Sequence, residues 1–319
     1  MNTVKLWPAV VLGAVLGFLA AGCGGQGGDN KPAEGAAGGK TITLAYVGYS
    51  STNAFWNALA DSAAKTAQKA GVKFVDLTAS KADMALQKAA LDNAILKKVD
   101  GLVVGAVDSR GLGDTFDKAK AAGIPIVTVD TRVDHEVVRS HVATDNIKAA
   151  NLAGEYIAGK LNKKGKVLIL GGATGSQTAD DRQKGVMEAI FRVADWDATK
   201  ANEITLNVLS ATPDLAAVFA ACDPMIMTAR QAVKSKDLMG KVLLVGFDAI
   251  PACLKAIESG EVDATVRQDP ERMGREGVEL MLKHLKGEQI PRHVPIDAVI
   301  IDKSNVAQYL EKGKSQAEK

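Results

Sequence analysis

GLVVGAVDSRGLGDTFDKAKAAGIPIVTVD, residues 101–130, is the stretch that decides the fold. It contains two apolar, valine-rich runs at 101–107 and 124–130, with a segment between them that suits an amphipathic helix over 112–122. Continuous apolar runs of this kind are typical of strands that a parallel sheet buries on both faces. The stretch therefore predicts a strand–helix–strand unit of a parallel α/β sheet.

The same alternation extends in both directions, from residue 41 to residue 302. Strands are predicted at 42–48, 73–77, 101–107, 124–130, 166–170, 215–220, 241–248, 263–268 and 295–302, with a short extended segment at 141–146. Helices are predicted at 55–69, 82–97, 112–122, 147–161, 178–190, 198–209, 225–233, 252–258 and 270–285. Because the series starts again after residue 146, and 319 residues with 47% apolar content can bury two cores, we expect two doubly wound α/β lobes.

The first 22 residues have the pattern of a signal peptide, with an apolar run over 9–19 and small residues directly before Cys23. LAAGC (19–23) resembles a bacterial lipobox, whose cysteine becomes diacylated. This predicts an exported protein that is lipid-anchored at Cys23 in the bacterial cell envelope and faces the periplasm or the cell exterior; an ordinary secreted protein is the alternative. Residues 24–40 carry no apolar side chain larger than Ala or Pro and are predicted to form a flexible tether.

The composition excludes several classes of function. Thirty-nine Lys and Arg against 37 Asp and Glu leave a net charge of +2, which gives no electrostatic basis for binding nucleic acid. After Cys23 only Cys222 and Cys253 remain, too few for a disulfide scaffold, and the sequence leaves open whether they pair or stay as buried thiols. The four histidines lack metal-binding spacing and no catalytic motif occurs, so no metal, cofactor or enzymatic activity is predicted.

Several aromatic and polar residues stand where predicted strands end, which is where open α/β sheets bind their ligands. Aromatic faces pack on the C–H face of a sugar ring, while carboxylate, amide and guanidinium groups bind its hydroxyls. Taken singly, each residue also suits core packing or a helix cap. As a set they are candidate ligand contacts: Asn53, Phe55, Trp56, Asp130, Arg182, Trp196, Phe247, Asp248 and Gln268.

Residues 41–302 resemble the ribose-type periplasmic binding proteins, whose fold is shared with sugar-responsive repressors. The resemblance rests on the order and spacing of STNAFWNAL (51–59), GIPIVTVDT (123–131), ATDN (143–146), DDRQKG (180–185), ADWD (194–197), TPDLAAVFAACD (212–223), VGFD (245–248) and ATVRQDP (264–270). It implies the type I periplasmic binding protein fold, with chain crossings near Thr144, Gln268 and Asp297 that form a three-segment hinge. The N-terminal lobe would comprise 41–144 plus 269–296, and the C-terminal lobe 145–268 plus 297–312.

The resemblance also implies a function and assigns ligand contact to the same nine residues. It implies a monomeric solute-binding lipoprotein that captures a small sugar or polyol between closing lobes and docks on the permease subunits of an ABC importer. The repressors' DNA-binding headpiece is missing, which favours transport over transcription. A sensory lipoprotein that presents its ligand to a chemoreceptor or receptor kinase is the alternative, and a sugar-modifying enzyme is less favoured.

Departures from the family pattern limit how far the ligand and the ligand contacts of the family apply to this chain. Ribose binders commonly have Asn, Arg, Arg and Asn where this chain has, in order, Gly105, Thr131, Ala198 and Cys222. Four lost polar partners argue against ribose itself, because an unpaired buried hydroxyl costs affinity. A segment is also missing between Arg182 and Trp196, so that either the second sheet lacks or shortens a strand, or FRVAD (191–195) supplies a short one and the helix before it ends early.

Overall fold

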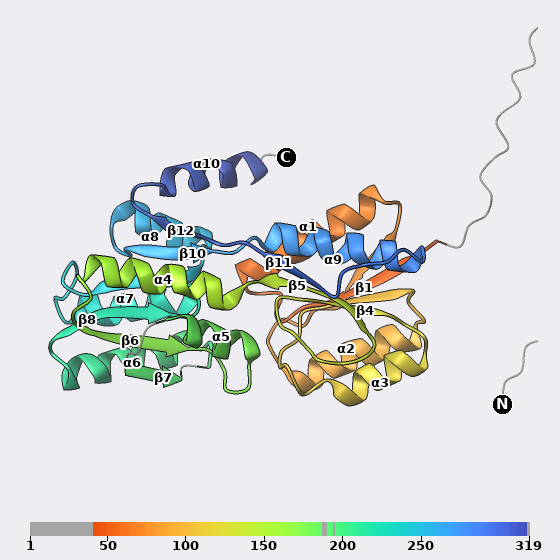
Figure 1. Cartoon of the computed structure of the whole chain (residues 1–319), viewed down its shortest axis with the longest axis horizontal. Helices are drawn as coiled ribbons and strands as arrows, with labels where there is room; N and C mark the ends of the chain where they lie inside the picture. Colours follow the sequence, from red (N-terminus) through yellow and green to blue (C-terminus); the bar gives the residue numbers. More distant parts are fainter. Residues whose placement is uncertain (1–40, 187–189, 194, 318–319) are drawn as a thin grey trace, which may run out of the picture. The chain divides into compact units, whose positions relative to one another are not determined.

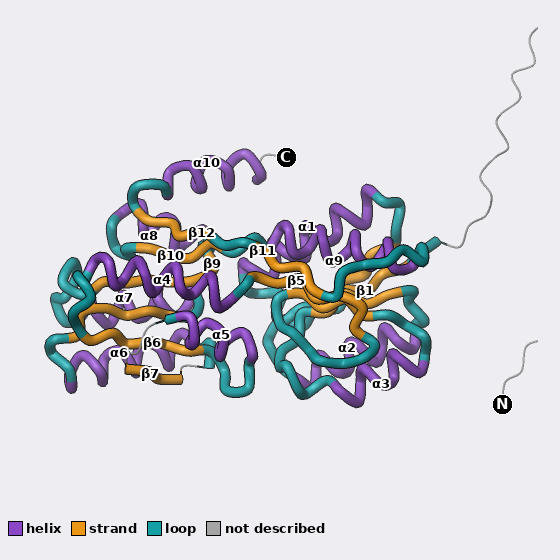
Figure 2. The backbone as a smooth tube through the Cα atoms, in the orientation of Figure 1, coloured by secondary structure: helices purple, strands orange, loops and turns teal. Residues whose placement is uncertain are grey.

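The computed structural model describes residues 41–186, 190–193 and 195–317, which form two α/β lobes (Figure 1). Each lobe contains one six-stranded sheet, sheet A in lobe A and sheet B in lobe B, with helices packed against it (Figure 2). The predicted fold of two parallel-sheet α/β lobes is confirmed. The predicted signal peptide, Cys23 and the tether lie outside the described residues.

Sheet A is parallel throughout, because every pair of neighbouring strands runs in the same direction. Its strands, in spatial order, are β11 (His293–Ile296), β5 (Val138–Thr144), β4 (Ile126–Val129), β3 (Gly101–Val104), β1 (Thr43–Val47) and β2 (Lys73–Asp76). Its helices are α1 (Ala54–Lys69), α2 (Met84–Leu96), α3 (Gly113–Ala121) and α9 (Pro270–Leu285). In Figure 1, α1 and α9 lie on one face of this sheet and α2 and α3 on the other, so the apolar strands are buried on both faces.

Sheet B has the same arrangement except at one edge. Its strands, in spatial order, are β12 (Val299–Asp302), β10 (Ala264–Arg267), β9 (Leu243–Asp248), β8 (Leu215–Ala220), β6 (Lys166–Gly171) and β7 (Ile190–Val193). Its helices are α4 (Asn146–Lys160), α5 (Gln177–Gly185), α6 (Ala198–Ala211), α7 (Asp223–Ser235), α8 (Pro251–Ser259) and α10 (Val306–Ala317). Only β12 is antiparallel to its neighbour among the described strands.

The chain passes between the sheets three times within the described residues. It leaves sheet A after β5, returns after β10, and leaves again between β11 and β12. Since the two sheets have the same strand order, β4 in sheet A and β9 in sheet B occupy equivalent positions. The two passages near Thr144 and Gln268 therefore lie beside the carboxyl ends of these strands, where a ligand would bind.

Two sequence predictions of individual elements were wrong, and one helix was missed. The predicted strand at 295–302 is two strands, because β11 pairs with β5 and β12 pairs with β10 in the other sheet. Hydrophobicity along one apolar run cannot show that the run changes sheets. The predicted helix 178–190 ends at Gly185, and the final helix α10 was not predicted.

The early end of α5 decides between the two alternatives for the missing segment, in favour of a short strand that follows a shortened helix. β7 (Ile190–Val193) pairs in parallel with β6, so part of FRVAD does supply a short strand. Gly185 lies close to α4, and an added Cβ would be 2.5 Å from the carbonyl oxygen of Ile147. This close approach requires glycine at the position where the helix ends.

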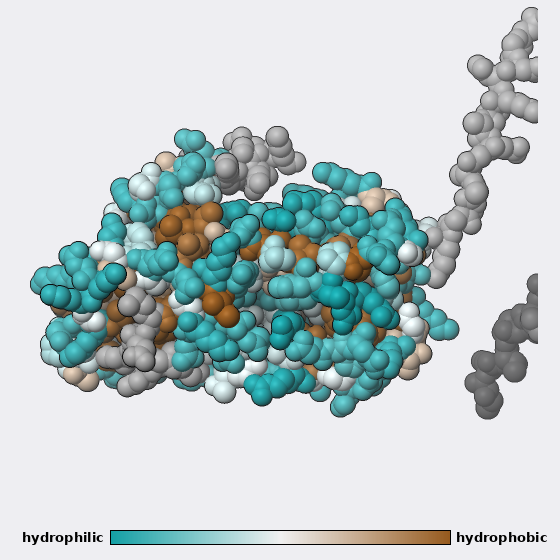
Figure 3. Space-filling model, viewed as in Figure 1, coloured by the Kyte–Doolittle hydropathy of each residue, from teal (hydrophilic) through white to brown (hydrophobic). Residues whose placement is uncertain are grey.

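Hydrophilic side chains dominate the face seen in Figure 3, as expected when the strand residues form the interior. In the part of the chain that the structure describes, no helix has both the length and the apolar character needed to cross a membrane. Cys222 and Cys253 are both buried free thiols.

Candidate functional site

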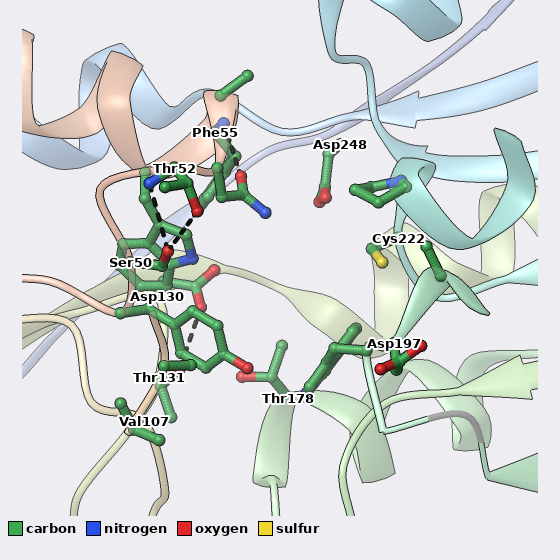
Figure 4. Close-up of a pocket in the computed structure, with 18 of the residues that line it drawn as sticks. Ser50, Thr52, Phe55, Val107, Asp130, Thr131, Thr178, Asp197, Cys222 and Asp248 are labelled. Carbon is green, nitrogen blue, oxygen red and sulfur yellow. Dashed lines mark hydrogen bonds between the residues drawn. The ribbon is translucent and has the colours of Figure 1, made fainter. Parts of the chain in front are cut away.

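A cavity of about 790 Å³ lies between the two lobes, at the carboxyl ends of both sheets (Figure 4). It is large enough for a small ligand, since such sites usually measure about 300–1,000 Å³. Eight of the nine candidate ligand contacts line it: Asn53, Phe55, Trp56 and Asp130 from lobe A, and Arg182, Trp196, Asp248 and Gln268. The ninth, Phe247, is fully buried and is not among the lining residues. Ligand contact by these residues stays a prediction.

The N-terminus of α1 places Asn53 and the two aromatic rings that follow it. Asn53 is the N-cap of this helix, and its side-chain oxygen accepts a hydrogen bond from the N–H of Phe55 at 2.9 Å. This bond satisfies one of the free N–H groups of the first turn. The cap and the helix begin directly beside the cavity, so Phe55 and Trp56 are held at its edge.

Two aspartates face the cavity from equivalent strand ends. Asp130 follows β4 with a φ of 59°, and Asp248 ends β9 with a φ of 119°. Left-handed φ values are uncommon for residues with a side chain and are found disproportionately at functional sites. The hydroxyl of Thr131 donates to Asp130 Oδ1 at 3.1 Å.

Arg182 is the central cation of the cavity, and its side chain is only 4% exposed. Its Nε donates to Asn146 Oδ1 at 2.9 Å and its Nη1 donates to the carbonyl of Ala221 at 2.7 Å. The guanidinium lies 3.9 Å from the centre of the Phe247 ring, a cation–π contact. The buried Phe247 ring therefore packs against the face of the guanidinium and helps to hold Arg182 in place.

A chain of hydrogen bonds joins Asp248 to the passages between the lobes. Gln268 Nε2 donates to Asp248 Oδ1 at 2.8 Å, while the hydroxyl of Thr144 donates to Gln268 Oε1 at 2.7 Å. The Asp248 carboxylate accepts, so the amide nitrogen of Gln268 faces it and the amide oxygen is left to accept from the Thr144 hydroxyl. Asn146 is fixed in a similar way, since its Nδ2 donates to the carbonyl of Thr144 at 3.1 Å.

Burial controls the charge of the carboxyl groups. It raises the pKa of Asp248 to about 8, against the opposing attraction of Arg182, whose Nη1 lies 3.8 Å from Asp248 Oδ1. Burial also raises the pKa of Asp130, again against Arg182. Asp223, behind Asp248, is fully buried, and its pKa rises to about 6 although its carboxylate accepts bonds from Thr265 and the Ile250 N–H.

The two tryptophans that border the cavity lie against glycines. A Cβ at Gly105 would be 2.2 Å from Trp56 Cζ3, and a Cβ at Gly172 would be 2.0 Å from Cε2 of Trp196. Such approaches leave no room for a side chain unless the indole ring moves. The structure thus explains why the chain has Gly105 where ribose binders commonly have Asn: the Trp56 ring occupies that space.

Sequence reasoning missed several cavity residues. Tyr49 lines the cavity and stacks on Trp56, with ring centroids 5.7 Å apart, and burial raises its pKa to about 12. It stands two residues after β1, so the rule that ligands bind beyond strand ends could have found it. Thr144 and Asn146 hold other site residues, and the family motif ATDN (143–146) marks their position but not that role.

Two similar α/β lobes with a polar and aromatic cavity between them define a two-lobed binding protein. The sequence model of the periplasmic binding protein domain matches residues 44–289, and the chain belongs to this family. The resemblance predicted from the sequence motifs is therefore confirmed.

Relatives with established names support this assignment. The ribose import binding protein RbsB of Salmonella typhimurium is 34% identical over 270 residues, covering 82% of this chain and 90% of the relative. The Haemophilus influenzae protein of the same name is 36% identical over 258 residues, covering 78% and 87%. A solved ABC transporter periplasmic solute binding protein from Actinobacillus succinogenes, with bound D-allose, has a TM-score of 0.79 and 29% identity, and covers 84% of this chain and 100% of that one.

Proposed function

We propose that this protein binds a small sugar or polyol between its two lobes and delivers it to the permease of an ABC importer. The observation that carries the proposal is the single cavity in which charged, amide and aromatic side chains from both lobes converge. The names of the relatives agree with it, since two are ribose import binding proteins and a solved neighbour holds D-allose.

The chemistry of the cavity suits a polyhydroxylated ligand. Asp130 and Asp248 can accept hydrogen bonds from ligand hydroxyls on opposite sides, while the fixed fork of Arg182 donates between them. The aromatic rings at the edge, Trp56 and Trp196, offer flat faces for the C–H side of a sugar ring. Binding and release need no bond to be broken, so in this proposal the carboxyl groups act as hydrogen-bond partners and not as catalysts.

In this proposal the lobes are discontinuous in sequence, comprising 41–144 plus 269–296 and 145–268 plus 297–312. The three passages act as the hinge, and ligand contacts from both lobes are satisfied together only when the lobes close. The buried bonds between Thr144, Gln268 and Asp248 link two of these passages to the ligand site.

A screen of monosaccharides and polyols by thermal unfolding of the purified protein tests the binding function. A ligand at 100 times its Kd should stabilise the fold by about 2.7 kcal/mol. The Asp130→Ala/Asp248→Ala double variant is the control and should lose the effect. A screen without any stabilising compound would refute sugar binding, and conversion of a bound sugar into a product would refute the non-enzymatic role.

The lipid anchor is a further part of the proposal, on the basis of the LAAGC motif that ends at Cys23. Cys23→Ser should abolish lipidation and release the protein from the membrane fraction, because acylated Cys23 is the anchor that the motif provides. Fractionation and metabolic labelling with a fatty acid measure both effects. Continued membrane association of the variant would contradict the anchor.

A further inference from the structure

The two lobes also contact each other outside the ligand cavity. The N–H of Gln177, the first residue of α5, donates to the hydroxyl oxygen of Ser109, in the loop after β3, at 3.3 Å. Neither residue is among those that line the cavity, although their neighbours Val107, Ser176 and Thr178 are. This contact therefore joins the lobes without touching a ligand.

On the side of lobe A, the contact is made by a turn with a fixed shape. Asp108 Oδ1 accepts hydrogen bonds from the N–H groups of Arg110 and Gly111, each at 2.7 Å. Bonds from an aspartate side chain to the backbone just after it stabilise a turn. Ser109 lies within this turn, so its hydroxyl is held in place before the lobes meet and little conformational entropy is lost in the contact.

On the side of lobe B, the contact is made by the glycine-rich loop GGATGS (171–176) and the start of α5. The side chain of Ser176 caps this helix. A Cβ at Gly175, whose φ is 87°, would lie 3.4 Å from Nη2 of Arg110, so the loop packs directly against the turn of lobe A. The sugar-binding proposal gives this packing no role.

The contact is separate from the hinge. In Figure 1 the passages between the lobes run above α5, the helix that begins at the contact. A polar groove of about 380 Å³ borders the contact and is lined by Arg110 and Arg132 from lobe A and by Asp180 from lobe B. Because a hydrogen bond is lost when its two partners move apart, the bond between Ser109 and Gln177 exists only while the lobes are closed.

One such bond has the strength that a reversible closure requires. A typical intramolecular hydrogen bond changes an equilibrium about twofold to tenfold. This bond would favour the closed form over the open form by that factor, whether or not a ligand is present. A ligand that leaves through the opened cleft would dissociate more slowly by the same factor, whereas its entry into the open form would be unaffected.

We propose that the turn 108–111 and the segment 171–177 form a latch, which holds the lobes closed and sets the rate of ligand release. The proposal rests on the proposed function and adds to it two residues, Ser109 and Gln177, that control affinity without contacting the ligand. The latch is coupled to the site because α5 also carries Arg182, which lines the cavity.

A proline at position 177 tests the bond directly. Gln177→Pro removes the donating N–H and leaves the helix intact, because proline is favoured at the first helical position and Ser176 before it is already extended, with a ψ of 114°. The variant should release its ligand about twofold to tenfold faster, with an unchanged association rate. Gln177→Ala is the matched control, since it keeps the N–H, and should release the ligand as wild type does.

Stopped-flow tryptophan fluorescence measures both rates, since Trp56 and Trp196 border the cavity. The probe is D-allose, or whichever monosaccharide of the thermal screen binds more tightly. Ser109→Ala removes the acceptor and should have the same effect as Gln177→Pro. The two substitutions together should be no worse than either alone, because they remove the same bond.

A disulfide tests the contact without relying on a known ligand. Ser109→Cys/Gln177→Cys should form a crosslink between the lobes in a buffer of oxidised glutathione, faster when D-allose is bound. The crosslinked protein should retain its sugar until the bond is reduced. Mass spectrometry of the linked peptides identifies the crosslink, and the Ser109→Cys single variant is the control.

The outcomes separate the latch from the binding function. Unchanged release rates in Gln177→Pro and Ser109→Ala, additive effects of the two, or no crosslink in the sugar-bound protein each overturn the latch while sugar binding stands. If no sugar binds, the proposed function fails and the crosslink in the ligand-free protein decides the latch: formation supports it, and absence overturns it.

Discussion

The two lobes place an aspartate at the same topological position and then surround it differently. Asp130 follows β4 and Asp248 ends β9, strands that occupy equivalent places in two sheets of identical order. Asp130 accepts a bond from its neighbour Thr131, whereas Asp248 accepts one from Gln268, which Thr144 holds in turn. The repeated fold supplies the position of each carboxyl group, and the side chains around it decide whether it is linked to the passages between the lobes.

The two tryptophans of the cavity stand at different topological positions but are accommodated in the same way. Trp56 in lobe A lies against Gly105, and Trp196 in lobe B lies against Gly172. Each lobe thus gives one indole ring to the cavity and needs one glycine to make room for it. The difference is that Trp196 also lies over Arg182, with 5.6 Å between the guanidinium carbon and the ring centre. Trp56 stacks instead on Tyr49 of its own lobe, so the two indole rings are held by different kinds of partner.

The largest expected difference between the two aspartates is in the pH dependence of stability. Burial raises the pKa of Asp248 from 3.8 to about 8 despite Arg182, and the carboxylates of Asp223 and Asp130 add to the rise. The folded state holds this proton more tightly than the unfolded chain, so the contribution of Asp248 to stability is complete below pH 4 and is lost as the pH rises toward 8. Asp248→Asn cannot ionise, and its stability relative to wild type should increase from pH 4 to pH 8 by at least about 3 kcal/mol.

Urea unfolding at one-unit steps between pH 4 and pH 8 measures this effect. Asp130→Asn is the matched control and should show a smaller change of the same sign, since burial raises the pKa of Asp130 against both the attraction of Arg182 and the hydrogen bond from Thr131. Parallel stability curves for wild type and Asp248→Asn would show that the carboxyl group of Asp248 titrates normally.

Removing either aspartate should weaken ligand binding. Asp130→Ala and Asp248→Ala should each cost about 1–3 kcal/mol, or about fivefold to a hundredfold in Kd, because a desolvated ligand hydroxyl loses its hydrogen-bond partner. Isothermal titration with a sugar found by the screen measures the loss. Asp214→Ala is the control, since Asp214 is exposed and pairs with Lys166 away from the cavity. Unchanged affinity in both cavity variants would show that the assigned site is wrong.

Substitution of the two glycines should lower stability by displacing the tryptophan rings. Gly105→Ala and Gly172→Ala place a methyl group within the indole rings and should each cost about 1–2 kcal/mol of stability as the ring is displaced into the cavity. Gly159→Ala on α4 has no atom within 4 Å of the added Cβ and should instead stabilise the protein by about 0.5–1 kcal/mol. Chemical unfolding and the fluorescence of the tryptophans report both effects. Normal stability of both cavity variants would mean that the rings do not lie where the structure places them.

The smallest expected effect concerns the hydrogen bonds that run from Thr144 through Gln268 to Asp248, for which Asp130 has no counterpart. Thr144→Val keeps the shape of the side chain but removes the hydroxyl that orients Gln268, and should lower affinity by about 1 kcal/mol, or roughly fivefold. Thr144→Ser restores the hydroxyl and should restore affinity, which a purely structural role of the methyl group would not produce. Equal affinity of Thr144→Val and wild type would show that the Thr144 hydroxyl is not needed to position Asp248.

Much of the molecule was determined by local sequence patterns. Apolar runs such as IPIVTVD fixed the strands and their parallel pairing, because only strands buried on both faces tolerate continuous Val and Ile. The rule that ligands bind beyond strand ends selected eight residues that do line the cavity. These features depend on short stretches of chain, and short stretches carry enough information to predict them.

Tertiary structure alone decided the features that depend on neighbours distant in sequence. The run 295–302 divides between two sheets because its halves pair with β5 and β10, and the Phe247 ring of β9 packs against the guanidinium of Arg182 from α5. The bond from Thr144 to Gln268 spans 124 residues, and no local pattern encodes it. Position along the chain thus determined which residues reach the cavity, whereas packing between distant segments determined how each is held there.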